Sequence, residues 1–250
     1  MIPAPEATLI AAAGILSGIV GSAGGITSLI SYPALLAAGI PAIPANVANI
    51  VAVAACWPGS ALASRPELKG TASWLRRWAW VTAAGGAIGA VLLLSTPAGA
   101  FGRIVPFLVA AGSVVLLLQP RLSARRGDHA HTSTPVLLAG LLPVSAYSGY
   151  FGAGSGVMTL SLVLLTVDQH VARANALKNM LIGTASVTSA VIFIIFSPVD
   201  WAAVLPLSIG MFAGSMIGPR VARHIPASIL RWLVALLGIG LAVKLWIAPA

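Results

Sequence analysis

The sequence predicts an all-α polytopic membrane protein built from two inverted-topology repeats. Three observations predict this fold. Of the 250 residues, 58% are hydrophobic and 8% are charged. A glycine cluster occurs twice, each time inside a long apolar stretch. The basic residues gather on one side only if each half crosses the membrane an odd number of times. Each half therefore holds a glycine-broken segment, re-entrant or crossing twice, followed by three transmembrane helices.

The composition argues against a soluble domain, because soluble domains carry about 25% charged residues. Apolar runs of about 20 residues, the length that spans a bilayer, recur along the chain. The expected apolar segments are 7–39, 43–64, 78–96, 101–118, 135–166, 174–197, 201–219 and 226–248. The polar stretch 119–134 is expected to be a cytoplasmic linker between a first repeat, 1–118, and a second repeat, 135–250.

The two glycine clusters read "GIVGSAGGI" (18–26) and "GYFGAGSGV" (149–157). A shift of 131 residues aligns Gly18 with Gly149, Gly21 with Gly152 and Gly25 with Gly156. After a deletion of two residues the shift is 129, and it aligns Asn46 with Asn175, Ser60 with Ser189 and Pro97 with Pro226. The paired asparagines and prolines, and the constant shift, indicate an internal duplication. Positions aligned by these shifts are called equivalent below.

The basic residues decide between parallel and inverted repeats. Eight simple crossings would place the basic residues of the two halves on opposite sides, against the positive-inside rule. With an odd number of crossings per half, twelve collect on one side: Arg65, Lys69, Arg76, Arg77, Arg121, Arg125, Arg126, Arg173, Lys178, Arg220, Arg223 and Arg231. Arg103 and Lys244 lie opposite. The basic loops are then cytoplasmic and both termini outside, a layout common in secondary transporters.

The same argument explains the net charge of +9. The excess of basic residues belongs to loops at a membrane surface. We therefore expect the lipid bilayer as a partner, and we expect no nucleic-acid partner.

A glycine cluster inside a span permits close helix packing or breaks the helix. Its recurrence in two overlong segments favours a break. A helix that starts near Gly25 or Gly156 presents free N–H groups and a positive dipole end, which attract an anion. The partner expected there is a small anionic substrate. The candidate contacts in the broken segments are Ser22, Gly24, Gly25, Ser28, Gly154, Ser155, Gly156 and Thr159.

The span that follows each broken segment adds polar candidates. Asn46 and Asn175 can contact the ligand or hold the broken segment in place, since an amide both donates and accepts. Asn49 and Asn179 lie one turn further on. Lys178 is either an intramembrane cation at the site or a side chain that snorkels to the cytoplasmic face.

The sequence gives little support for cation transport, enzyme activity or a metal site. All five acidic residues fall at span ends or in loops, which argues against a cation transporter. The single cysteine, Cys56, is expected to pack as a small apolar residue, and the four histidines lie in loops. We expect no enzyme activity, metal or cofactor. Two GxxxG-type rows, Gly85/Gly89 and Gly210/Gly214/Gly218, are packing faces within one chain or between two, so a homodimer stays open.

The duplicated motif resembles the TauE/SafE-type sulfite exporters, small bacterial anion permeases. The two copies read "GIVGSAGGITSLISYPALLAAGIPAIPANVAN" and "GYFGAGSGVMTLSLVLLTVDQHVARANALKN". The resemblance implies a secondary transporter in the bacterial inner membrane that exports sulfite, sulfoacetate or a related sulfonate. The residues themselves favour only an anion. A passive small-anion channel and a transporter of another oxyanion or carboxylate remain alternatives.

Overall fold

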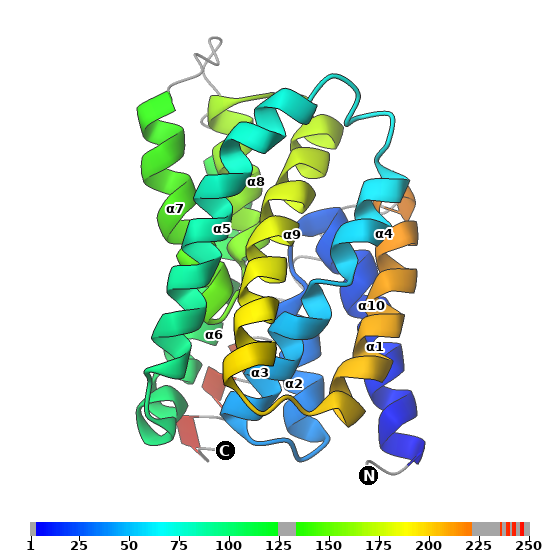
Figure 1. Cartoon of the computed structure of the whole chain (residues 1–250), viewed down its shortest axis with the longest axis vertical. Coiled ribbons are helices and arrows are strands. Elements are labelled where there is room, and N and C mark those ends of the chain that lie inside the picture. The colour runs from blue at the N-terminus through cyan, green and yellow to red at the C-terminus, as the bar shows by residue number, and fades with distance from the viewer. Residues whose placement is uncertain are drawn as a thin grey trace.

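The computed structural model describes residues 4–124 and 134–221, together with isolated positions between 236 and 247. The two continuous stretches fold into α-helices without strands (Figure 1). In chain order they are α1 (Ala4–Gly24), α2 (Ser28–Ala37), α3 (Ala42–Val53), α4 (Cys56–Ala63), α5 (Ala72–Leu94), α6 (Ala98–Ala124), α7 (Thr134–Tyr150), α8 (Ser155–Thr166), α9 (Val171–Phe196) and α10 (Trp201–Val221). Within this part, six helical segments are long and apolar enough to cross a membrane. The expected all-helical, multi-pass fold is confirmed.

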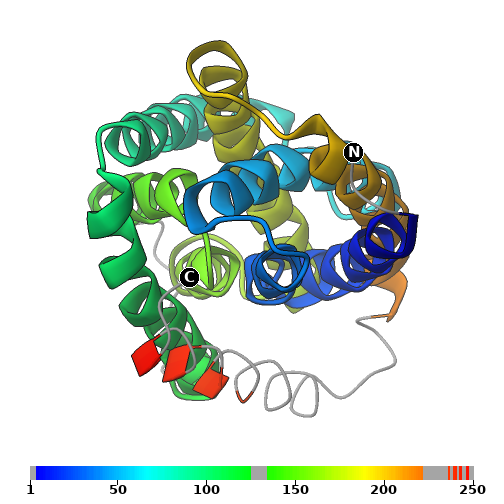
Figure 2. The same cartoon turned by 90° about the horizontal axis from the view of Figure 1, so that it is seen from below.

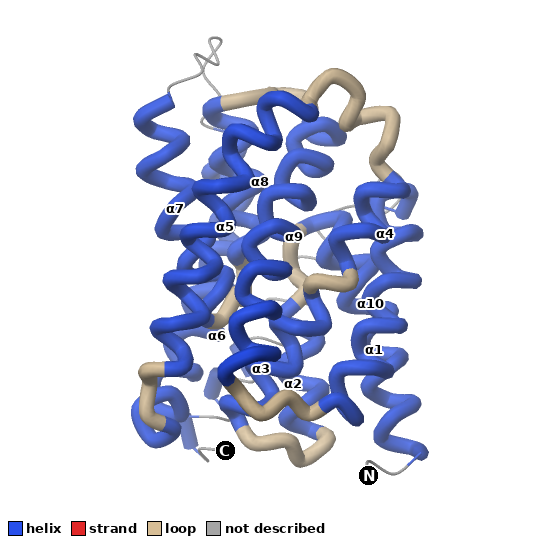
Figure 3. The backbone as a smooth tube through the Cα atoms, in the orientation of Figure 1, coloured by secondary structure: helices blue, strands red, loops and turns tan. Residues whose placement is uncertain are grey.

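Both glycine clusters break the helix in which they lie. α1 ends at Gly24 and α2 begins at Ser28, while α7 ends at Tyr150 and α8 begins at Ser155. In each case the chain turns back. The α1–α2 hairpin opens toward the lower end of the bundle in Figures 1 and 3, and the α7–α8 hairpin opens toward the upper end.

The first half contains one more break, which the sequence pattern did not predict. The expected span 43–64 is divided into α3 and α4 at Ala54 and Ala55. Pro58 explains the break because proline has no N–H to donate to the Ala54 carbonyl, and that carbonyl accepts instead from Trp57 N at 3.2 Å. The equivalent position in the second half is Val187, and α9 continues through it unbroken.

The glycine rows join the two halves within one chain. α1 packs along α10, and α5 packs along α7, as the view from the lower end shows (Figure 2). A Cβ atom at Gly214 would lie 2.9 Å from Ile19 N, and one at Gly89 would lie 2.7 Å from Tyr150 N. Only glycine allows backbones to approach this closely. The first helix of each half is therefore held by the other half.

The described basic residues lie mostly at one end of the bundle. Loops 64–71 and 167–170 are at the upper end, whereas loops 38–41, 95–97 and 197–200 are at the lower end (Figure 3). The chain order therefore puts six described basic residues at or near the upper end: Arg65, Lys69, Arg76, Arg77, Arg173 and Arg220. Arg103 follows the lower loop 95–97.

Some expectations fall on other parts of the chain. The predicted linker 119–134 begins inside α6, and its residues 125–133 lie outside the described residues. The same holds for most of the predicted span 226–248 and for Arg125, Arg126, Arg223, Arg231, Lys244 and the side chain of Arg121.

The contact between α5 and α7 generates a first prediction. Gly89→Ala places a methyl group against the Ala146 carbonyl and Tyr150 N. Overpacking of this kind costs about 1–3 kcal/mol, so the melting temperature of the purified protein should fall by several degrees. Gly102→Ala is the matched control, because a Cβ atom at Gly102 meets no atom of the described residues within 4 Å. Equal melting temperatures for the two variants would contradict this account of the packing.

Candidate functional site

The two broken segments touch each other at Gly25, which follows the end of α1, and at Gly156, in the first turn of α8. A Cβ atom at Gly25 would lie 2.5 Å from the carbonyl carbon of Gly156, and one at Gly156 would meet the Gly25 backbone. Gly25 also has a φ of 82°, which side-chain-bearing residues rarely adopt. These glycines therefore serve both functions considered from the sequence: they allow close packing, and Gly25 accommodates the break.

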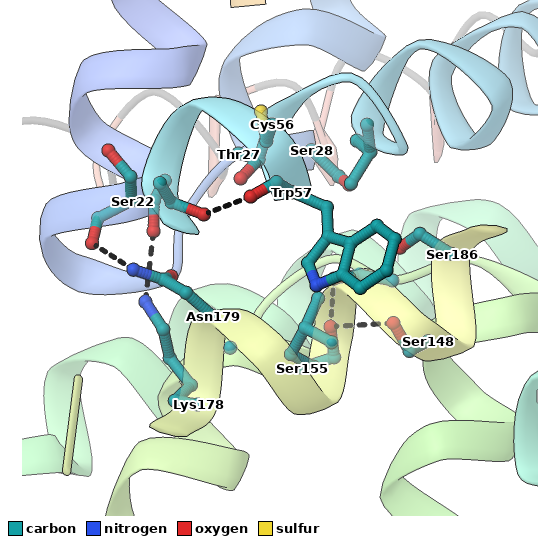
Figure 4. Close-up of a pocket in the computed structure, with 18 of the residues that line it drawn as sticks. Ser22, Thr27, Ser28, Cys56, Trp57, Ser148, Ser155, Lys178, Asn179 and Ser186 are labelled. Atoms are coloured by element: carbon teal, nitrogen blue, oxygen red, sulfur yellow. Dashed lines mark hydrogen bonds between the residues drawn. The ribbon is translucent and has the colours of Figure 1, made fainter. Parts of the chain in front are cut away.

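A cavity lies beside this crossing (Figure 4). Its volume is about 40 Å³. One water needs roughly 10–15 Å³ by this measure, so the space suits a few waters or one small anion. Seven of the candidate residues line the cavity: Ser22, Gly25, Ser28, Ser155, Gly156, Lys178 and Asn179.

The two halves supply equivalent positions to the wall. Five such pairs line the cavity: Gly21 and Gly152, Gly25 and Gly156, Ile50 and Asn179, Val53 and Ile182, and Trp57 and Ser186. The cavity is therefore bounded by corresponding elements of both halves: the two breaks and the spans that follow them.

Two helix amino termini lie against the cavity. Thr27 and Ser28, at the start of α2, line it, as do Ser155 and Gly156, at the start of α8. The first turns of a helix carry partial positive charge and N–H groups without intrahelical partners. The Ser28 hydroxyl accepts a hydrogen bond from Asn49 Nδ2 at 3.0 Å, which leaves its own proton available for a ligand. Both termini favour a negatively charged occupant.

The carboxyl end of α1 is bound by three side chains of α9. Lys178 Nζ donates to the Gly21 carbonyl at 3.1 Å. Asn175 Nδ2 and Asn179 Nδ2 donate to the Ser22 carbonyl at 2.8 Å and 3.0 Å. Lys178 is only 1% exposed, so it does not snorkel to the surface, and that alternative is wrong.

The equivalent asparagine of the first half does the same for the second half. Asn46 Nδ2 donates to the Tyr150 carbonyl, at the end of α7, at 2.8 Å. Neither Asn46 nor Asn175 lines the cavity. Asn49 links α3 to α2 through Ser28 and Ser31. The amides of Asn46, Asn49 and Asn175 therefore hold the broken segments in place. This is one of the two functions expected for Asn46 and Asn175.

Three other candidates lie away from the cavity wall. Thr159 is buried in α8 and donates to the Ser155 carbonyl at 2.9 Å. Gly154 precedes α8 with a φ of 80° and approaches Gly112 of α6. Gly24, the last residue of α1, is not among the lining residues either.

The structure adds lining residues to which the glycine pattern did not point. They are Thr27, Ile50, Val53, Cys56, Trp57, Ser60, Ser148, Ile182, Gly183 and Ser186. Cys56 packs with its Sγ atom 3.8 Å from the Met211 carbonyl oxygen, but it also forms part of the wall. Pro58 inside an apolar span is the sequence signal that could have drawn attention to Cys56 and Trp57.

The charges around the cavity are unbalanced. Among the described residues that line it, Lys178 is the only charged side chain. The described carboxylates lie elsewhere. Glu6 is in the first turn of α1, and Asp168 is 3.3 Å from Arg173 Nε at the upper end of the bundle. A buried ammonium group without a carboxylate partner is costly, and an anion in the cavity would offset that cost.

Comparisons with known proteins agree with this architecture. The model of the family described as sulfite exporter TauE/SafE matches residues 7–245. Probable membrane transporter protein ORF9 of Sinorhizobium sp. is 28% identical over 251 residues, which cover 95% of this chain and 91% of the relative. Probable membrane transporter protein YfcA of Escherichia coli K12 is 26% identical, with 92% and 86% covered. A probable membrane transporter protein of Haemophilus influenzae is 27% identical, with 93% and 91% covered.

No solved structure matches the chain significantly. The family model, however, spans nearly the whole sequence, and it confirms the resemblance seen in the duplicated glycine motif. The chain belongs to the TauE/SafE sulfite exporter family and is a multi-pass membrane transporter.

Proposed function

We propose that this protein is a secondary transporter that exports a small sulfur-containing anion across the bacterial inner membrane. Sulfite, sulfoacetate and related sulfonates are the substrates in view. The observation that carries the proposal is the position of Lys178. Its buried ammonium group lines the cavity, and its one described hydrogen bond goes to a backbone carbonyl. A bound anion would supply the missing negative charge.

The remaining wall suits an oxyanion. The starts of α2 and α8 contribute helix amino termini, which bind anions through N–H groups and the helix dipole. Hydroxyl groups from both halves, among them Ser28 and Ser148, add further possible donors. A compact anion with several acceptor oxygens could use these donors together. The small size of the cavity also favours such an occupant.

We further propose that the two halves are inverted repeats and that transport proceeds by alternating access around the cavity. The opposite openings of the two broken hairpins and the equivalent positions in the wall support this topology. The upper end, which carries most of the described basic residues, would be cytoplasmic, and the N-terminus would be outside. The close contact of Gly25 with Gly156 favours a transporter over a channel, because a channel needs an open path past this crossing.

Lys178→Met tests the proposed anion site. The substitution removes the cation and keeps an apolar side chain of similar length. A charge-assisted hydrogen bond contributes about 1.5–3 kcal/mol, so sulfite uptake into proteoliposomes should fall at least about tenfold at subsaturating concentration. Lys69→Met, in an exposed loop, is the matched control and should retain the wild-type rate. Wild-type uptake by Lys178→Met would rule out the site as proposed.

Cysteine labelling tests the topology. Cys56 is the only cysteine, so Cys56→Ala gives a background without native thiols. Pro41→Cys and His170→Cys then place single thiols at exposed, equivalent positions of the two halves. In right-side-out vesicles an impermeant maleimide should label the first and spare the second. Labelling of both from the same side would exclude inverted repeats.

A further inference from the structure

The cavity has one bulky wall. Trp57 follows the break between α3 and α4, and its indole ring extends toward the side of the cavity formed by Ser148, Ser155 and Ser186 (Figure 4). The residue is also 40% exposed. The indole therefore lies at the edge of the cavity, in contact with the interior and accessible from outside the chain.

The position of the ring depends on Gly183 of α9. A Cβ atom added at Gly183 would collide with Cδ1 and Cγ of Trp57 and would lie 2.8 Å from its Cβ atom. The indole therefore occupies the space that any larger residue at position 183 would fill. This contact fixes the base of the Trp57 side chain against α9.

The equivalent position of the second half carries no such bulk. The position equivalent to Trp57 is Ser186, which lines the same cavity with a small polar side chain. The break at Ala54 and Ala55 also has no counterpart in α9. Trp57 is therefore a departure from the duplicated pattern, located where bulk directly reduces the space left for a ligand.

We propose that Trp57, held against Gly183, sets the upper size limit of the transported anion. This inference rests on the proposed function, since it concerns the same cavity. The indole leaves room for an ion of the size of sulfite or a short sulfonate and excludes sulfonates with a bulky organic group. Trp57 thereby determines specificity by steric exclusion, an effect of about 10–200-fold for a single extra methylene group in a pocket.

The test measures competition against labelled sulfite uptake by the full chain in proteoliposomes. The competitors are methanesulfonate, sulfoacetate and benzenesulfonate. In Trp57→Ala, the ratio of the inhibition constant of benzenesulfonate to that of unlabelled sulfite should fall at least about tenfold. Trp57→Phe, which keeps an aromatic wall, should change this ratio less. Trp80→Ala is the matched control, because Trp80 lies on α5, is 80% exposed and does not line the cavity.

Two results would overturn the inference and are distinguishable. If wild-type protein takes up sulfite but Trp57→Ala keeps the wild-type ratio, or weakens all competitors equally, the size limit lies elsewhere and the proposed function stands. If wild-type protein takes up neither sulfite nor a short sulfonate, both proposals fail. Should Trp57→Ala not fold, Trp57→Leu takes its place, and an unchanged ratio in that variant has the same meaning.

Discussion

The structure depends on how backbone groups are satisfied where helices end within the span of the bundle. A carbonyl or N–H group without a partner costs several kcal/mol in hydrocarbon, so irregular backbone there must be covered by protein or water. α1 and α7 both end in this way. The Ser22 carbonyl is bound by Asn175 and Asn179, and the Tyr150 carbonyl by Asn46. The side chains that bind the carbonyls at each break thus come from the opposite half. They can reach these carbonyls only because the glycine contacts bring the two halves close together.

The departures from the duplicated pattern provide the chemistry. Lys178 stands where the first half has Asn49, and it adds a cation to a wall otherwise built from glycine, hydroxyl, amide and apolar groups. Trp57 stands where the second half has Ser186 and adds bulk. The shared elements form the cavity and its helix amino termini. In our account, Lys178 sets the charge of the ligand that the cavity favours, and Trp57 sets the size of that ligand.

Much of this architecture could be predicted from the sequence. Hydropathy indicated the spans, and the repeated glycine clusters indicated the two breaks near Gly25 and Gly156. The direction of individual side chains could not be predicted. The sequence leaves two functions open for Asn46 and Asn175, and only the packing of α3 and α9 shows that their amides bind backbone carbonyls.

Long-range geometry also explains what the sequence pattern missed. Whether the chain turns back at each break depends on how α2 and α8 pack, which no local pattern encodes. In the sequence, Trp57 is an ordinary apolar residue. Its position at the cavity depends on the helix break caused by Pro58 and on the space that Gly183 leaves for its ring. Lys178 could equally have reached the surface. Its burial follows from the nearby α1 terminus, whose Gly21 carbonyl offers its ammonium group a hydrogen-bond acceptor.

The central claim is that the cavity between the two broken segments binds a small oxyanion. Isothermal titration of the purified protein with sulfite tests it most directly, with sodium chloride at matched ionic strength as the reference titration. The account predicts saturable binding of sulfite with a stoichiometry near one per chain, abolished by prior saturation with a short sulfonate. The absence of saturable binding for sulfite and for every short sulfonate would contradict it.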